Sequence, residues 1–298
     1  MEVVDAHMHL WDFESGNYPW LSENLAGGEK MIGNYDSIKK NYFPDDYNKD
    51  IKNTSVSKCV HIQVFGYPNN PSQETVWLQK LSEKHRIPNA IVGYVDLQDE
   101  NIENEINKHL KCDNFRGIRN VLSYHSGDED LRMINDRKIM SSPSWLNGFS
   151  FLDKHNLSFD VQIFDEQIDD LIAVADRFKN VPIIINHLAW PTDLSTKGFE
   201  NWKSRIKQAS SLPNIHIKIS GFGCVFKSIS SDVISPYIST CIEFFGVDRC
   251  MWGSNFPVES IFSSYSKSLD SVVESISSLS EDDKSKVMKL NAENFYKI

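Results

Sequence analysis

The sequence predicts an α/β fold in which a single (β/α)8 TIM-like barrel, forming one domain, spans residues 1–298. Eight short apolar runs recur along the chain. Most of them are rich in Val and Ile and too short for buried helices, so we interpret them as strands. Most runs start roughly 25–40 residues apart, which fits a strand followed by a crossover helix. The predicted strands are residues 3–11, 58–65, 90–97, 115–122, 157–164, 181–188, 214–222 and 249–255.

The segments between these runs predict helices and two long loops. Residues 72–85 place apolar side chains among charged ones, and residues 166–178 carry an apolar stripe at helical spacing. We predict an extended active-site loop at 12–57, after the first strand, and a second long loop at 123–133, after the fourth. The serine-rich tail, 263–285, is interpreted as the last one or two helices. A barrel of this kind carries its active site at the C-terminal ends of the strands.

The charge and the cysteine content exclude some classes of partner. The net charge of −10 and the pI near 5.4 predict no nucleic-acid partner and no anionic membrane surface. An acidic small molecule stays compatible, because a pocket can hold local Arg and Lys. Five scattered cysteines, an odd number without a CxxC pair, predict reduced thiols in a cytoplasmic protein. The sequence leaves the oligomeric state open.

Histidines stand at the ends of two predicted strands. His7 and His9 lie two apart on the first strand, so both imidazoles can point into the barrel mouth and share one metal. His187 closes the strand at 181–188, where it is a candidate third ligand or a general base. Three neutral nitrogens with one open position match a catalytic zinc site. The alternative is that these are hydrogen-bonded core histidines.

Two arginines on the fourth predicted strand are candidates for binding substrate. Arg116 and Arg119 are three residues apart, so on a regular strand they point to opposite faces, unless Gly117 introduces a kink. We predict that Arg119, nearer the C-terminal end, lies inside the mouth. There its guanidinium can bind a carboxylate or an array of hydroxyl groups. The alternative is a structural ion pair with a nearby acidic residue.

Four further residues are predicted to contact the substrate. Gln162 and Lys218 lie on the fifth and seventh strands, although a buried ion pair with Asp160 is the alternative role for Lys218. Trp11 and Trp190 follow strand ends and are predicted to form pocket walls. Their alternative role is packing in the core.

Several motifs, in order, cover nearly the whole chain. They are "VDAHMHLWD", "GNYPWL", "RGIRNVL", "FDVQI", "VPIIINHLAWP", "NIHIKISGFG", "FGVDRCMWGSNFPVE" and "NAENFYKI". In this combination the sequence resembles the amidohydrolase superfamily, and within it the sugar-acid lactonase branch typified by L-fuconolactonase and L-rhamnonolactonase. The resemblance implies a TIM-like barrel, hydrolysis of a lactone ring and often a divalent metal. The similar dicarboxylate pyrone lactonases work without a metal.

The chain departs from this pattern at two places. The family motif usually reads Gly-Ser-Asp-[Trp/Phe]-Pro, and its Asp is the expected metal ligand or general base; here the position is Asn255. An amide does not accept a proton at neutral pH, although its carbonyl oxygen can coordinate or accept a hydrogen bond. The second departure is Ala-Trp-Pro, ending in Pro191, where Gly-Lys-Pro is common. Glu259 is a further candidate base, its alternative being a surface carboxylate.

The leading hypothesis is therefore a lactonase that opens a small sugar-acid lactone with an activated water. A metal at His7, His9 and His187, with zinc expected, would lower the pKa of its water from about 15.7 towards about 7. Without a metal, His187 would act as the base. Two alternatives stay open: a decarboxylase of a small unsaturated or aromatic acid, and a barrel that binds a ligand without catalysis because Asn255 replaces Asp.

Overall fold

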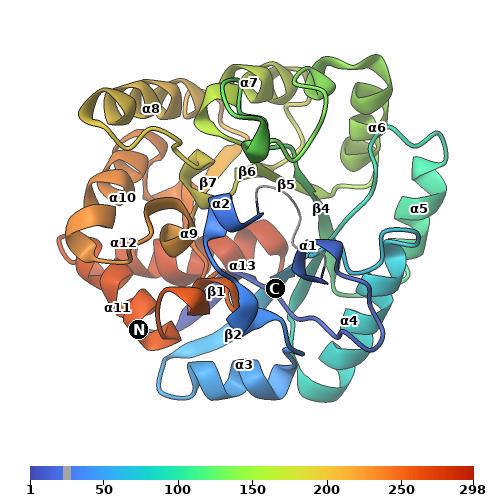
Figure 1. Cartoon of the computed structure of the whole chain (residues 1–298), viewed down its shortest axis with the longest axis horizontal. Coiled ribbons are helices and arrows are strands. Elements are labelled where there is room, and N and C mark those ends of the chain that lie inside the picture. Colours follow the sequence, from blue (N-terminus) through green and yellow to red (C-terminus); the bar gives the residue numbers. More distant parts are fainter. Residues whose placement is uncertain (23–27) are drawn as a thin grey trace.

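In this computed structural model, which describes residues 1–22 and 28–298, eight parallel strands form a nearly closed barrel in sequential order (Figure 1). This confirms the predicted fold class. Each strand lies within or close to a predicted apolar run, but most end earlier, because the last residues of the runs turn into the loops at the mouth. The strands are β1 (Val3–Met8), β2 (Val56–Ile62), β3 (Ala90–Gly93), β4 (Phe115–Val121), β5 (Ser158–Gln162), β6 (Ile183–Ile185), β7 (Ile215–Ile219) and β8 (Cys250–Trp252).

Helices surround the strands, and Figure 1 shows α13 lying across the middle of the barrel. The predicted helices at 72–85 and 166–178 correspond to α4 and α7, and the serine-rich tail forms α11 and α12. The loop predicted at 12–57 includes the short helices α1, α2 and α3 and the first residues of β2, and its residues 23–27 lie outside the described part of the chain. The helices are α1 (Pro19–Ser22), α2 (Gly28–Ile32), α3 (Pro44–Ile51), α4 (Ser72–His85), α5 (Ile102–His109), α6 (Pro143–Lys154), α7 (Ile168–Arg177), α8 (Thr196–Ala209), α9 (Phe222–Phe226), α10 (Ser231–Phe245), α11 (Tyr265–Ser275), α12 (Glu281–Ser285) and α13 (Asn291–Tyr296).

Two apolar layers hold the barrel together. A small cluster inside the barrel includes Val4, Ala6 and Met251, together with Ala292 and Tyr296 of α13. A much larger cluster lies between the strands and the outer helices. Burial on both faces explains why the strands are continuous runs of Val and Ile rather than alternating patterns. The five cysteines are free and buried. In the described part of the chain, no helix is both long and apolar enough to cross a membrane.

The barrel closes where the end of β1 meets the segment after β8. The Asn255 N–H donates to His7 O at 2.7 Å, and the His9 N–H donates to Phe256 O at 2.8 Å. These two bonds continue parallel pairing beyond the short β8, and a bridge pairs Met8 with Phe256. The histidines of β1 and the amide of Asn255 are therefore held on adjacent segments.

A buried carboxylate lies beneath this closure. Asp5 is fully buried and accepts hydrogen bonds from the Ser254 N–H at 2.8 Å and the Ser254 hydroxyl at 2.6 Å. The hydroxyls of Tyr47 on α3 and Tyr265 on α11 donate to its Oδ2 at 3.0 and 2.8 Å. The His7 N–H donates to Oδ1 at 3.1 Å. One side chain thus joins β1, the segment after β8 and two outer helices.

We expect Asp5→Ala to lower the free energy of unfolding by at least about 3 kcal/mol, because several buried donors lose their acceptor. Asp5→Asn keeps the volume and one acceptor, so its loss should be smaller. Urea denaturation measures both. The control is Asp176→Ala, which removes an exposed partner of Lys179 and should cost about 0.5 kcal/mol or less. A loss for Asp5→Ala no larger than the control's would contradict this role of Asp5.

Candidate active site

Three of the predicted histidines and Asn255 meet at the C-terminal ends of the strands. His7 belongs to β1 and His9 follows it, His187 lies two residues after β6, and Asn255 lies three residues after β8. The ring centroids of His7 and His9 are 4.9 Å apart, and those of His7 and His187 are 4.7 Å apart. His9 Nε2 is 3.2 Å from Asn255 Oδ1. The barrel thus brings together residues separated by up to 248 positions in the chain.

The three imidazoles differ in their partners. His9 Nδ1–H donates to the Ile62 carbonyl at 2.7 Å, and His187 Nδ1 pairs with the Ser220 hydroxyl at 2.9 Å. Neither ring nitrogen of the fully buried His7 has a hydrogen-bond partner among the described residues. Since an unpaired buried polar group is costly, His7 requires a partner that another molecule or ion supplies.

Burial keeps these rings neutral. Loss of hydration lowers the pKa of His7 and of His187 well below the ordinary value, and it lowers the pKa of His9 to about 3. The positive charges of Lys218 and Arg119 lower the pKa of both His7 and His187 further. At neutral pH each ring therefore carries one proton and one lone pair, the form that accepts a proton or binds a metal.

The contact between His9 and Asn255 constrains what occupies the site. With its proton on Nδ1, His9 presents a lone pair at Nε2, and this lone pair faces the Asn255 carbonyl oxygen. Two acceptors at this distance repel each other unless something lies between them. Either the amide turns its NH2 group towards His9, or a cation is shared by the two lone pairs.

The donor chemistry suits a metal, but no preformed cluster is seen. Among residues 1–22 and 28–298, no group of three His, Cys, Asp or Glu side chains is arranged to hold a metal ion. The neutral rings of His7, His9 and His187 are nevertheless ligands that zinc prefers. The unpartnered nitrogens of His7 are the observation that fits a metal best.

Arg119 and Gln162 lie side by side near the histidines. Arg119 Nη2 donates to Gln162 Oε1 at 2.5 Å, and Nη1 donates to the Gln63 carbonyl at 3.3 Å. Burial lowers the pKa of Arg119 to about 10, so it stays charged at neutral pH. In the described part of the chain no carboxylate forms an ion pair with it, and its Nε has no partner. This buried positive charge is available to an oxygen-rich ligand.

Three of the predicted substrate contacts have structural partners within the protein instead. Lys218 is fully buried and pairs with Asp160 at 2.5 Å and with the Tyr296 hydroxyl at 2.8 Å, so the alternative ion pair is present. Arg116 donates to backbone carbonyls at the start of β4 and lines a surface cavity beside the last residue, Ile298. Trp11 is fully buried, and its Nε1–H donates to the Lys40 carbonyl at 2.6 Å.

Trp190 lies next to His187. The two ring centroids are 5.9 Å apart in an edge-to-face arrangement, and the indole is 8% exposed. Glu259 differs from the expected surface carboxylate, because it is fully buried and accepts from the Gly223 N–H. Burial raises the pKa of Glu259 to about 7, while the nearby Asn255 amide opposes this shift. Of the two roles left open for Glu259, the surface carboxylate is therefore wrong, whereas its role as a base stays a prediction.

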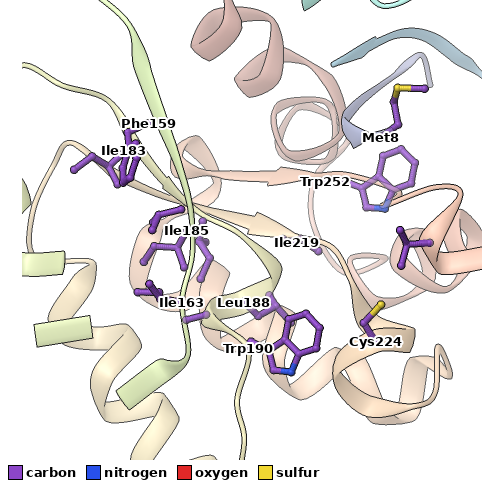
Figure 2. Close-up of a cluster of buried hydrophobic side chains, with 14 of the residues drawn as sticks. Met8, Phe159, Ile163, Ile183, Ile185, Leu188, Trp190, Ile219, Cys224 and Trp252 are labelled. Atoms are coloured by element: carbon purple, nitrogen blue, oxygen red, sulfur yellow. The ribbon is translucent and has the colours of Figure 1, made fainter. Parts of the chain in front are cut away.

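Residues 187–190, which we call the left-handed turn, include the last two residues, 187–188, of the strand predicted at 181–188. Instead four consecutive non-glycine residues have positive φ: 53° at His187, 58° at Leu188, 58° at Ala189 and 39° at Trp190. Such a conformation costs about 1–2 kcal/mol per residue and is normally adopted by single residues. Figure 2 shows Leu188 and Trp190 beyond Ile185, the last residue of β6. The turn redirects the chain so that His187 and Trp190 lie side by side.

Sequence reasoning also missed the residues that make room for His187. Gly221 follows Ser220 after β7 and has φ of +72°. A Cβ atom at Gly221 would lie 2.5 Å from His187 Nδ1. The motif "SGFG" was the available signal, because a glycine directly after a strand end often marks a close approach of the backbone.

We expect Gly221→Ala to destabilise the protein more than Gly33→Ala. Gly33 also has a positive φ, +80°, but a Cβ there meets nothing within 4 Å among the described residues. The control should cost about 1 kcal/mol for backbone strain. Gly221→Ala should cost a further 1–3 kcal/mol or so for the clash with His187. Urea unfolding of both variants measures the difference, and equal losses would contradict the contact.

Comparison with known proteins identifies the family and the fold of the chain. The family model described as Amidohydrolase matches residues 4–298. The chain is 36% identical to the uncharacterized protein y4mH of Sinorhizobium fredii, over 99% of this chain and 98% of that protein. It is 27% identical to an L-fucono-1,5-lactonase of Burkholderia ambifaria, over 86% of this chain and 80% of that enzyme. A crystal structure of an amidohydrolase from Burkholderia multivorans with bound Zn has a TM-score of 0.83 at 20% identity, covering 100% of both chains.

Proposed function

Since the chain belongs to the amidohydrolase family, we propose that it hydrolyses the ester bond of a small lactone, most directly a sugar-acid lactone. The similarity to an L-fucono-1,5-lactonase supports the reaction class. The observation that carries the proposal is the meeting of three neutral histidines, Asn255 and a buried Arg119 at the C-terminal end of the barrel, where no carboxylate of the described residues pairs with the guanidinium. Hydrolysis of a lactone needs a group that activates water and a positive group that stabilises the oxyanion.

His187 is the proposed base. Its Nδ1 pairs with the Ser220 hydroxyl, which fixes the ring, and Nε2 is the nitrogen left for a water molecule. A neutral imidazole can take the proton as the water attacks the lactone carbonyl and can return it to the ring oxygen as the ester bond breaks. Asn255 does not accept a proton, and it acts by orienting His9 or a ligand shared with His9.

Arg119 is the proposed anion-binding group. The negative charge that develops on the carbonyl oxygen, and the carboxylate of the opened product, both need a charged donor in a site with little water. Gln162 holds one end of the guanidinium in place. The Trp190 indole, packed edge to face against His187, supplies an apolar wall for the lactone ring.

A divalent metal, with zinc expected, would be held by His7, His9 and His187. When bound, it would supply a more acidic water and a polarised carbonyl. His7 would then gain the partner that its two ring nitrogens lack among the described residues. Metal analysis of the purified protein, and its activity after treatment with a chelator, decide between a metal-bound water and His187 as the source of the nucleophile.

A pH-indicator screen of sugar-acid lactones tests the proposed function. We expect His187→Ala to lower kcat by about 10²–10⁴-fold on the best lactone, the usual contribution of a general base. His85→Ala, on the outer helix α4, is the control and should retain wild-type activity. Acid release that survives in His187→Ala would contradict the assignment. CO2 release from a carboxylic acid panel would instead identify a decarboxylase, and tight binding without turnover would identify a non-catalytic barrel.

The role of Asn255 is tested with two substitutions at that position. Asn255→Ala removes the group that faces His9 Nε2, so this nitrogen, or a ligand that it shares with Asn255, loses a partner and kcat should fall by about tenfold or more. Asn255→Asp keeps an oxygen at this place and adds a group that accepts a proton, so it should retain more activity than Asn255→Ala. Circular dichroism checks that both variants fold. Full activity of Asn255→Ala would remove this residue from the chemistry.

A further inference from the structure

The left-handed turn has an anchor outside the active site. Trp202, on α8, is fully buried, and its indole Nε1–H donates to the Leu188 carbonyl at 2.7 Å. Leu188 directly follows His187 in the chain and lies two residues before Trp190. The Trp202 ring itself is stacked on Phe199 and packs against Tyr237. Its position is therefore fixed by the outer layer of helices and not by the mouth of the barrel.

The bonds within the turn do not explain its conformation. The Ala189 N–H donates to Asn186 O at 3.1 Å, and the Trp190 N–H donates to His187 O at 2.8 Å. Short turns of either hand can form such bonds, and for side chains other than glycine the right-handed form is favoured. The bond from Trp202 is different, because it fixes the direction of the Leu188 carbonyl from outside the turn. Strained backbone persists only where surrounding contacts determine it in this way.

The orientation of the His187 ring depends on the backbone of the left-handed turn. Its ring is anchored at one side by the Ser220 hydroxyl and lies close to Gly221. The Leu188 carbonyl belongs to the peptide between Leu188 and Ala189, so its rotation changes ψ of Leu188 and φ of Ala189. Such a rotation alters the turn that connects His187 to Trp190, and with it the contact between their two rings. A small change at Leu188 would therefore disturb the histidine and the indole together.

We propose that Trp202 is a positioning residue, which acts through the Leu188 carbonyl to hold the left-handed turn and so to direct His187 and Trp190. As far as turnover is concerned, this inference rests on the proposed hydrolase function. The structural part, that Trp202 sets the orientation of His187, is independent of the substrate.

The test compares two tryptophan substitutions. Trp202→Phe removes the N–H group and keeps a large aromatic ring. Trp145→Phe is the matched control: Trp145 is also buried, on α6, and its Nε1 has no hydrogen-bond partner among the described residues. We expect kcat to fall about tenfold in Trp202→Phe with KM nearly unchanged, and to stay within about twofold of wild type in Trp145→Phe. Equal kcat values in the two variants would overturn the proposal.

A second substitution separates positioning from packing. Ala189 has φ of 58°, a conformation that glycine adopts without steric cost. Adding Ala189→Gly to Trp202→Phe should therefore restore much of the lost kcat, because the turn then needs less support from outside. A loss of kcat that Ala189→Gly does not restore would mean that Trp202 only packs against its neighbours, and it would overturn the proposal.

The ring signals of His187 provide a readout that needs no substrate. In NMR spectra of protein with 15N-labelled histidine, Trp202→Phe should shift the His187 ring resonances and Trp145→Phe should leave them unchanged. If wild type opens no lactone, the proposed function fails while this comparison still decides the role of Trp202. Unshifted His187 signals in Trp202→Phe would overturn the inference even in an active hydrolase.

Discussion

The geometry of the candidate active site depends most on the hydrogen bonds that the Asp5 carboxylate accepts. It lies at the closure of the barrel, where donors from β1, from the segment after β8 and from two outer helices converge on one side chain. His7 and Asn255 continue directly from the two segments that it joins. The spacing between the histidines of β1 and the amide after β8 is therefore set by a group that does not itself enter the mouth.

Electrostatics explains how an acidic chain can contain the anion-binding site that we propose at Arg119. The net charge is −10, yet the buried charges near the histidines include two cations. Lys218 is neutralised by Asp160, whereas no carboxylate among the described residues pairs with Arg119. The surplus positive charge also helps to keep His187 neutral. The same arrangement thus suits an oxygen-rich ligand and keeps the proposed base, His187, in its proton-accepting form.

Periodicity along the chain was sufficient to predict the barrel and the place of His7, His9 and His187, because strand ends in this fold meet at one mouth. Periodicity could not distinguish residues of the same type that have different roles. Trp11 and Trp190 both follow strand ends, but the first is buried behind a loop and the second lies against His187. It also missed the left-handed turn, since "HLAW" contains no glycine to signal positive φ. Such a conformation is imposed by tertiary contacts, which the local sequence does not encode.

An amide at position 255 suits the site electrostatically, because a buried carboxylate, Glu259, lies nearby. Glu259 is buried, and loss of hydration is the main reason that its pKa is raised to about 7. A second carboxylate at position 255 would place like charges together in a region with little water, which raises the pKa of such a pair further. An amide avoids this repulsion and instead lowers the pKa of Glu259. Asn at position 255 is thus compatible with a site in which the carboxylate of Glu259 lies behind the mouth. In the function proposed above, proton transfer would then be carried out by a histidine, or by the more acidic water that a bound metal would supply.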